Sequence, residues 1–169
     1  MDTLSIFGLQ FVLSLVVYAL LANWNVVPWL AEKPTHQALI PLIFPHALRH
    51  LGLAFLVPEL IAQPLPSFFA YTAGYGDFIS GLLALVSLIA LRARWGLSLV
   101  LVWLFNIVGT VDLLNALRQA EAVPNLGTTW YIPTFVVPIL LVTHSMIFIR
   151  LFREWGKSLS SSKGQAVEI

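Results

Sequence analysis

Five stretches of the sequence are long, apolar and nearly free of charge, and they restrict the fold more than any other feature. Each holds about 20 to 27 residues, enough for a helix rising 1.5 Å per residue to cross roughly 30 Å of hydrocarbon. A backbone exposed to lipid must satisfy its own hydrogen bonds, which a helix does within one segment. The sequence therefore predicts an all-α bundle of five transmembrane helices at residues 4–30, 39–61, 67–91, 97–117 and 130–151.

Composition agrees with a membrane protein. Of 169 residues, 59% are hydrophobic and 10% are charged, against about 25% charged residues in soluble domains. The net charge of +1 leaves no basic surface to neutralise phosphates, which argues against a nucleic-acid partner. The absence of cysteine excludes thiolate metal sites and cysteine nucleophiles. We expect one transmembrane domain over residues 1–156 and a flexible, serine-rich cytoplasmic tail over residues 157–169.

Lysine and arginine are distributed unevenly between the loops, and this predicts the orientation. With five spans, successive loops alternate between the two sides of the membrane. One side receives Lys33, Arg92, Arg94, Arg150, Arg153, Lys157 and Lys163, and the other side receives Arg118 alone. The positive-inside rule then places the N-terminus outside and the C-terminus in the cytoplasm. We expect a multi-pass protein of the cell membrane, which in a bacterium is the inner membrane.

Three ionisable residues, His46, Arg49 and His50, lie close together inside the second apolar run. At 3.6 residues per turn they share one face of a helix. Ionisable groups near the middle of a membrane are costly, so they need partners inside the protein and are candidates for function. The sequence therefore places its candidate site around this face.

The third and fourth apolar runs supply partners for Arg49. Asp77 lies within a stripe of small residues, which lets neighbouring helices approach closely and predicts that this helix is the most buried. The stripe consists of Ala70, Ala73, Gly74, Asp77, Ser80, Gly81, Ala84 and Ser87. The fourth run carries Asn106 and Asp112. We expect Arg49 to form an ion pair with Asp77, and Asp112 is the alternative partner.

His144 in the fifth run is expected to face His50 across the interior, because neither ring belongs in lipid. Three histidines, His46, His50 and His144, would then hold a divalent metal, as imidazoles do in zinc, iron, manganese and copper sites. Axial ligation of haem b by His50 and His144 is an alternative. A third reading is a proton-carrying chain, and a fourth is a hydrogen-bonded network with a purely structural role.

These residues lead to a functional expectation. We expect a buried site that binds or converts a lipophilic small molecule such as an isoprenoid, quinone, fatty-acyl or sterol-like compound. In an enzyme, His50, His144 and Asp77 would act as catalytic acid, base or proton carrier. The residues expected to contact the ligand are Arg49, Tyr18, Asn106, Asp112 and Tyr75. The non-catalytic alternatives are an accessory membrane subunit and a proton-coupled carrier; the sequence gives no oligomeric state.

Overall fold

The computed structural model describes residues 1–167, with side chains for residues 1–156, and this part of the chain is helical without strands. Five of its helices are long and apolar enough to cross a membrane: Thr3–Ala31, Thr35–Leu56, Ser67–Arg92, Ser98–Leu117 and Gly127–Gly156. The predicted all-α fold and the predicted number of apolar helices are therefore confirmed. Insertion in a membrane and its orientation stay predictions.

Two of the five apolar helices contain a wider, π-helical turn. The first comprises α1 (Thr3–Leu21), the π turn η1 (Ala22–Val26) and α2 (Val27–Ala31), and the last comprises the π turn η6 (Ile132–Val136) and α6 (Val137–Val167). Pro28 and Pro138 each lie two residues after such a turn. Proline has no N–H to donate and its ring crowds the preceding turn, so a local change in helix type relieves the clash without ending the helix.

The remaining spans are α3 (Thr35–Ala47) with the 3₁₀ helix η2 (Leu48–Leu56), then α4 (Ser67–Arg92) and α5 (Ser98–Leu117). Short 3₁₀ turns, η3 (Pro58–Leu60), η4 (Ala120–Asn125) and η5 (Gly127–Trp130), lie in the connections. The second span thus starts before the predicted residue 39 and ends before residue 61. Helix α6 continues past residue 151 into the segment predicted as a flexible tail; residues 168–169 lie outside the described part.

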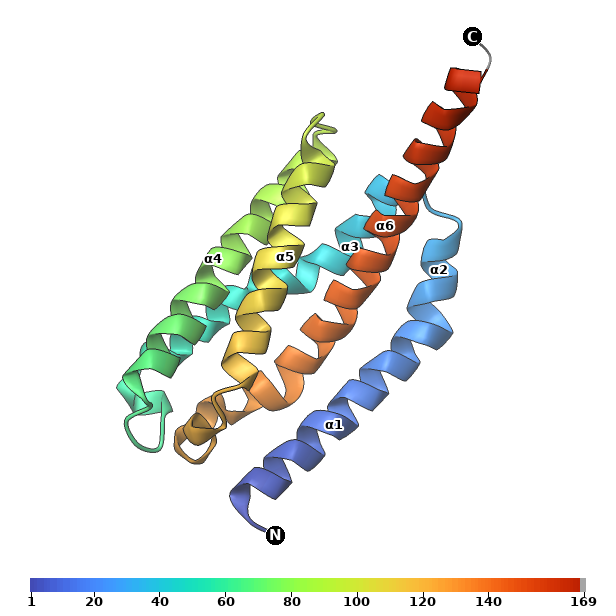
Figure 1. Cartoon of the computed structure of the whole chain (residues 1–169). Helices are drawn as coiled ribbons and strands as arrows, with labels where there is room; N and C mark the ends of the chain where they lie inside the picture. Colours follow the sequence, from blue (N-terminus) through green and yellow to red (C-terminus); the bar gives the residue numbers. More distant parts are fainter. Residues whose placement is uncertain (168–169) are drawn as a thin grey trace.

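Helices α3, α4, α5 and α6 surround the interior, while α1 and α2 lie along α6 on the outside of this group (Figure 1). No residue of α1 is buried, whereas half of the most apolar window of α4 is buried, the largest share of the five. The prediction that the third span is the most buried is therefore confirmed. Its small side chains explain why η2 and α5 both pack closely against it.

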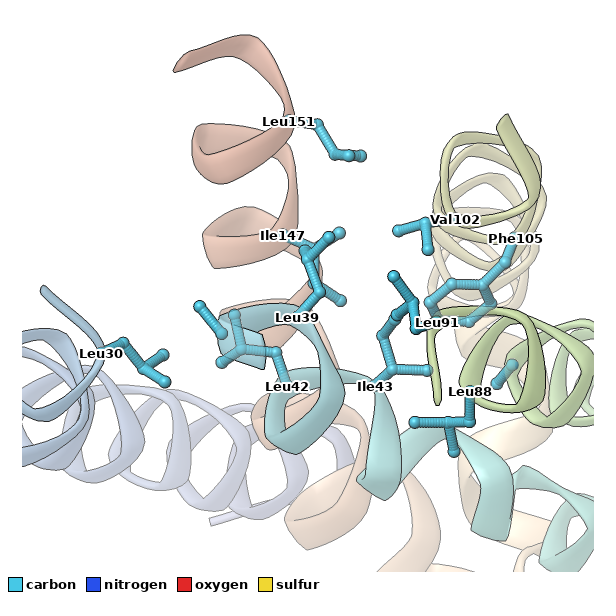
Figure 2. Close-up of a cluster of buried hydrophobic side chains, with 12 residues drawn as sticks. Leu30, Leu39, Leu42, Ile43, Leu88, Leu91, Val102, Phe105, Ile147 and Leu151 are labelled. Carbon is cyan, nitrogen blue, oxygen red and sulfur yellow. The ribbon is translucent and has the colours of Figure 1, made fainter. Parts of the chain in front are cut away.

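The two ends of the bundle have different residues and are named here by one of them. The Trp130 end contains the start of α1, the η3 turn and the η4–η5 connection, and the Arg94 end contains the α2–α3 and α4–α5 connections (Figure 1). Lys33 and Arg94 belong to these two connections, and Arg150 donates to the Leu30 carbonyl near the end of α2. A large apolar cluster occupies the Arg94 half of the interior (Figure 2). It includes Leu39, Ile43, Leu91, Val102, Phe105, Ile147 and Leu151.

Candidate functional site

Arg49 lies at the centre of the bundle because the second span changes from an α-helix to a 3₁₀ helix just before it. In a 3₁₀ helix, residues three apart lie in line. Arg49, Gly52 and Phe55 are the buried residues of η2, and His46, three residues earlier, is also buried. Because buried residues recur every three positions, one line of side chains points inward and His50 points away from the interior.

The Arg49 guanidinium joins three helices. Its Nε donates to Oδ1 of Asp77 on α4 at 2.7 Å, and its Nη2 donates to Oδ2 of Asp112 on α5 at 2.5 Å. Its Nη1 donates to the Gly109 carbonyl at 3.0 Å. The Arg49 side chain is fully buried, and those of Asp77 and Asp112 are 10% and 14% exposed. The predicted ion pair with Asp77 is confirmed, and Asp112 is a second partner at the same time.

Glycines on three elements make room for these ion pairs. A Cβ atom at Gly52 would lie 2.2 Å from Oδ2 of Asp77, and a Cβ at Gly109 would lie 2.7 Å from Nη1 of Arg49. A Cβ at Gly76 would lie 1.8 Å from Oδ1 of Asp112. All three distances are shorter than side-chain atoms tolerate, so only glycine lets the backbones approach the charged groups this closely.

His144 receives the next hydrogen bond from Arg49, with 3.4 Å between Nη1 and Nε2. Since the guanidinium only donates, Nε2 must accept, and the ring proton is on Nδ1, 2.7 Å from Oδ1 of Asn106. Nδ2 of Asn106 in turn donates to the His144 carbonyl at 3.3 Å. These bonds specify a neutral His144 with both ring nitrogens engaged by protein groups.

His46 continues the network away from Arg49. Its ring centroid lies 4.0 Å from that of His144, and its Nε2 lies 2.9 Å from Oγ1 of Thr143. The Thr143 hydroxyl already donates to the Ile139 carbonyl at 2.8 Å, so Nε2 of His46 is the donor. Its other nitrogen, Nδ1, is buried and has no partner among the described residues. His46 is therefore also neutral in this arrangement.

The structure corrects the prediction that His50 faces His144. The residue is exposed, and its Nδ1 lies 3.2 Å from the carbonyl of Ala47 on its own helix. The face shared by His46, Arg49 and His50 was derived for a continuous α-helix, in which each residue turns 100°. Each 3₁₀ residue turns 120°, so the error accumulates over η2 and carries His50 to the outside.

Two predicted ligand contacts also lie outside the central network. Tyr18 is partly buried against Phe135, with 5.6 Å between ring centroids, and Tyr75 is exposed and stacked on Tyr71 at 6.1 Å. Tyr18 was predicted from helical spacing, which gives the face of one helix but not which neighbour covers that face. Tyr75 was predicted as an aromatic residue at the mouth of a pocket. Asn106 lies in the network as a partner of His144.

The donor set gives no support to the predicted metal triad. In the described part of the chain, no group of three or more histidine, aspartate or glutamate side chains is arranged to hold a metal ion. His50 lies apart, and His144 has no free nitrogen lone pair, because Nε2 accepts from Arg49. The same two observations argue against His50 and His144 as the axial ligands of a haem b.

A slot at the Trp130 end leads to the two carboxylates. It contains about 600 Å³ of empty space, part of it open, of which the centre of a water molecule can reach about 60 Å³. Asp77 and Asp112 are its charged lining residues, and Arg49 does not line it. Its apolar walls come from α1, η2, α4, α5 and η4–η6, and include Phe7, Phe55, Phe69, Leu113, Val123 and Leu126.

Charge at the inner end of the slot is unbalanced. Arg49 supplies one positive charge, the neutral histidines supply none, and the two ionised carboxylates supply two negative charges. Each carboxylate uses one oxygen on Arg49, which leaves Oδ2 of Asp77 and Oδ1 of Asp112 without a hydrogen bond in the described part of the chain. A buried excess of negative charge favours a proton, a cation or a hydrogen-bond donor at this place.

Part of this arrangement could be predicted from the sequence. The charged and imidazole groups that meet were predicted, except that His50 lies apart, but the slot and the roles of Gly52, Gly76 and Thr143 were not. A signal was present for the glycines, because Gly76 precedes Asp77 and Gly52 follows Arg49 by three residues. No comparable signal marks Phe7, which reaches the slot from α1 through tertiary packing.

Comparison with known proteins gives one match. The sequence profile of a family described as a domain of unknown function (DUF8737) matches residues 6–152, which include all the transmembrane candidates but their outermost residues. No curated protein and no solved structure matches the chain.

Proposed function

Because the chain belongs to this family of unknown function, DUF8737, its role has to be argued from its own geometry, and we propose that it binds a lipophilic small molecule in the slot. The observation that carries the proposal is an apolar slot whose inner end has two carboxylates with free oxygens. Ligand sites combine mostly apolar walls with a few polar groups that fix orientation, and this slot has that composition.

The dimensions of the slot favour a slender ligand. Only about 60 Å³ of its empty space admits the centre of a water molecule, so the walls lie close to one another. An alkyl or isoprenoid chain fits such a space better than a wide fused-ring system. Aromatic side chains, including Phe7 and Phe69, would contact the chain along its length.

The polar end of the ligand would meet carboxylates and not the guanidinium. The expectation that Arg49 contacts the ligand does not fit the slot, because Arg49 is buried behind its two aspartates. Asp77 and Asp112 would accept hydrogen bonds from a hydroxyl, an amine or another donor. If the protein is an enzyme, these two carboxylates, and not the histidines, are the groups that could exchange a proton with the ligand.

The apolar cluster at the Arg94 end argues against the carrier alternative. The polar network ends at His46 and Thr143, and beyond it lie twelve buried apolar side chains in Figure 2, Leu39 and Leu91 among them. None of these twelve side chains can carry a proton or bind an ion, and the hydroxyl of Ser87, next to Leu88, donates to the Leu83 carbonyl of its own helix. The arrangement suits binding from one side of the bundle better than transport across it.

Thermal unfolding with ten-carbon amphiphiles tests the proposal. The full chain in lipid nanodiscs is heated with decanol, decylamine, decanoate or decane, and tryptophan fluorescence reports unfolding. A ligand at about 100 times its Kd stabilises by about 2.7 kcal/mol, which for a chain of this length raises Tm by on the order of 5 °C. We expect decanol and decylamine to raise Tm and decanoate to leave it unchanged.

A matched pair of variants locates the binding. Ala120 is exposed and lines the slot, whereas Ala62 is exposed at the same end and does not. Ala120→Trp should abolish the rise in Tm, and Ala62→Trp should retain it. A rise that survives Ala120→Trp, or one that decane gives equally, would show that the amphiphiles act through the lipid and would favour the structural alternative.

A further inference from the structure

Two hollows at the Arg94 end are joined and differ sharply in character. The first, of about 1340 Å³ and open, is lined by Lys33, Arg92 and Arg94 together with Trp29, His36 and the start of α3. The second, of about 1070 Å³ and open, lies between α3 and α4 and has mainly apolar walls. Both are lined by Ile40 and Arg92, so the basic hollow continues into the apolar one.

Among the described side chains, none neutralises the cations of the first hollow. Arg92 and Arg94 are exposed, and neither side chain forms an ion pair or hydrogen bond within the described part of the chain. The Lys33 ammonium lies over the Trp29 ring, 4.6 Å from its centroid, which holds it at the hollow without cancelling its charge. No acidic residue lines this hollow.

The start of α3 adds backbone donors to the same hollow. Pro34 precedes the helix and no side chain caps it, so the first N–H groups of a 13-residue helix point outward. Such groups and the positive end of the helix dipole favour an anion. Glu154 accepts from the Thr35 hydroxyl at 2.7 Å, and neither it nor Glu32 is among the lining residues.

Arg94 occupies a backbone conformation that usually belongs to glycine. Its φ is +55°, and it follows the last residues of α4, where the Trp95 N–H donates to the Ala90 carbonyl at 2.9 Å and the Arg94 N–H to the Leu91 carbonyl at 3.3 Å. Helices that end in this pattern commonly place glycine at this position. An arginine at this position makes the protein less stable than a glycine would. The turn therefore does not account for Arg94, whereas binding of a ligand by its side chain would.

The second hollow has the shape and chemistry of a groove for an acyl chain. Its walls are Phe44 and Ile40 from α3 and Leu85, Leu88 and Ile89 from α4, with Arg92 at its basic end. Both helices are long and apolar enough to cross a membrane, so this groove lies along their length at the depth of lipid chains.

We propose that the joined hollows bind one anionic phospholipid, with its phosphate among Lys33, Arg92, Arg94 and the start of α3, and one acyl chain in the groove between α3 and α4. Basic pockets between transmembrane helices are suited to anionic lipid headgroups. The uneven distribution of basic residues explains cations at this end in general. It does not explain their convergence on one uncapped helix start or the groove that continues from them.

Native mass spectrometry of the full chain tests the proposal. The protein in detergent is mixed with equal amounts of phosphatidylglycerol and phosphatidylcholine that carry the same acyl chains. We expect one retained phosphatidylglycerol per chain. Arg92→Gln with Arg94→Gln should lower the preference about 25-fold, about fivefold for each cation removed. Arg153→Gln, at the same end but lining a different hollow, should leave the preference unchanged.

Two further variants separate lipid binding from folding and from simple anion binding. Arg94→Gly should lower the preference about fivefold while Tm in lipid-free detergent stays equal or rises, because glycine accepts the positive φ. Ile89→Trp fills the groove and should lower lipid retention with all cations in place. Equal retention of both lipids, an equal loss in Arg153→Gln, or displacement of the lipid by millimolar inorganic phosphate would overturn the proposal.

Discussion

Removing Arg49 should destabilise the protein far more than removing either of its carboxylate partners. The variants are Arg49→Gln, Asp77→Asn and the two combined; each replaces a charged group with a neutral one of similar shape. The reason for the asymmetry is the charge count, because one guanidinium is shared by two carboxylates at 2.7 and 2.5 Å.

The magnitudes follow from Coulomb's law. With about 4 Å between charge centres and an effective dielectric constant of about 20, each ion pair contributes about 4 kcal/mol. If the two carboxylate charges are taken as about 6 Å apart, they repel each other by about 3 kcal/mol on the same scale. Asp77→Asn loses one attraction and relieves this repulsion, a net cost of about 1 kcal/mol. Arg49→Gln loses both attractions and keeps the repulsion. Because a carboxylate can take up a proton, the total loss of stability is limited to the value of about 3–5 kcal/mol observed for broken buried pairs.

Thermal unfolding in detergent, followed by the fluorescence of the six tryptophans, measures these differences. About 2–4 °C per kcal/mol is expected for a chain of this size, so Asp77→Asn should lower Tm by a few degrees and Arg49→Gln by about 6–20 °C. The double variant should be more stable than Arg49→Gln alone. Arg118→Gln, at an exposed position, serves as the control. Equal losses in the two single variants, or a double variant worse than Arg49→Gln, would refute the shared-cation reasoning.

Two other substitutions test close packing and the histidine assignment by the same unfolding measurement. Gly109→Ala should destabilise the protein by about 1–3 kcal/mol, because its Cβ would overlap the guanidinium of Arg49. Gly8→Ala, whose Cβ has nothing within 4 Å, should stabilise α1 by about 0.5–1 kcal/mol. A loss of stability at both positions would contradict the close-approach argument. His50→Gln should change stability by less than about 0.5 kcal/mol. His144→Leu should cost about 1–3 kcal/mol, because it leaves Oδ1 of Asn106 and one N–H of the Arg49 guanidinium without a partner. The reverse order would restore His50 to the interior.

The long-range pairing of charges could be predicted from sequence for a physical reason. Arg49, Asp77 and Asp112 carry the formal charges in the middle of three apolar runs, and a charge at membrane depth has few partners to choose from. Burial of the third span was predictable in the same way, from small residues at helical spacing. Both inferences depend only on depth and on one helical period.

The details of the site could not be predicted because they depend on a change of helical period and on contacts between helices. With an α-helical period, His50 would lie on the same face as His46. In the 3₁₀ helix η2, the residues that face the interior are Arg49, Gly52 and Phe55. Nothing in the order of residues fixes where such a change begins. The slot depends on seven elements, from α1 to α6, converging at the Trp130 end, and tertiary packing of this kind leaves no local pattern.

The orientation in the membrane is the last prediction, and it decides which side can supply the slot. The connections that contain Lys33 and Arg94 lie at one end of the bundle, and the slot lies at the other, so the positive-inside rule places the mouth of the slot outside the cytoplasm. Since the chain has no cysteine, single cysteines at Ala62 and at Gly96 give a clean test with a membrane-impermeant maleimide; both positions are exposed. Ala62→Cys should react in intact cells, and Gly96→Cys only after the membrane is opened. The opposite pattern would invert the protein and direct the slot to cytoplasmic ligands, while reaction of both in intact cells would mean that the number of spans is wrong.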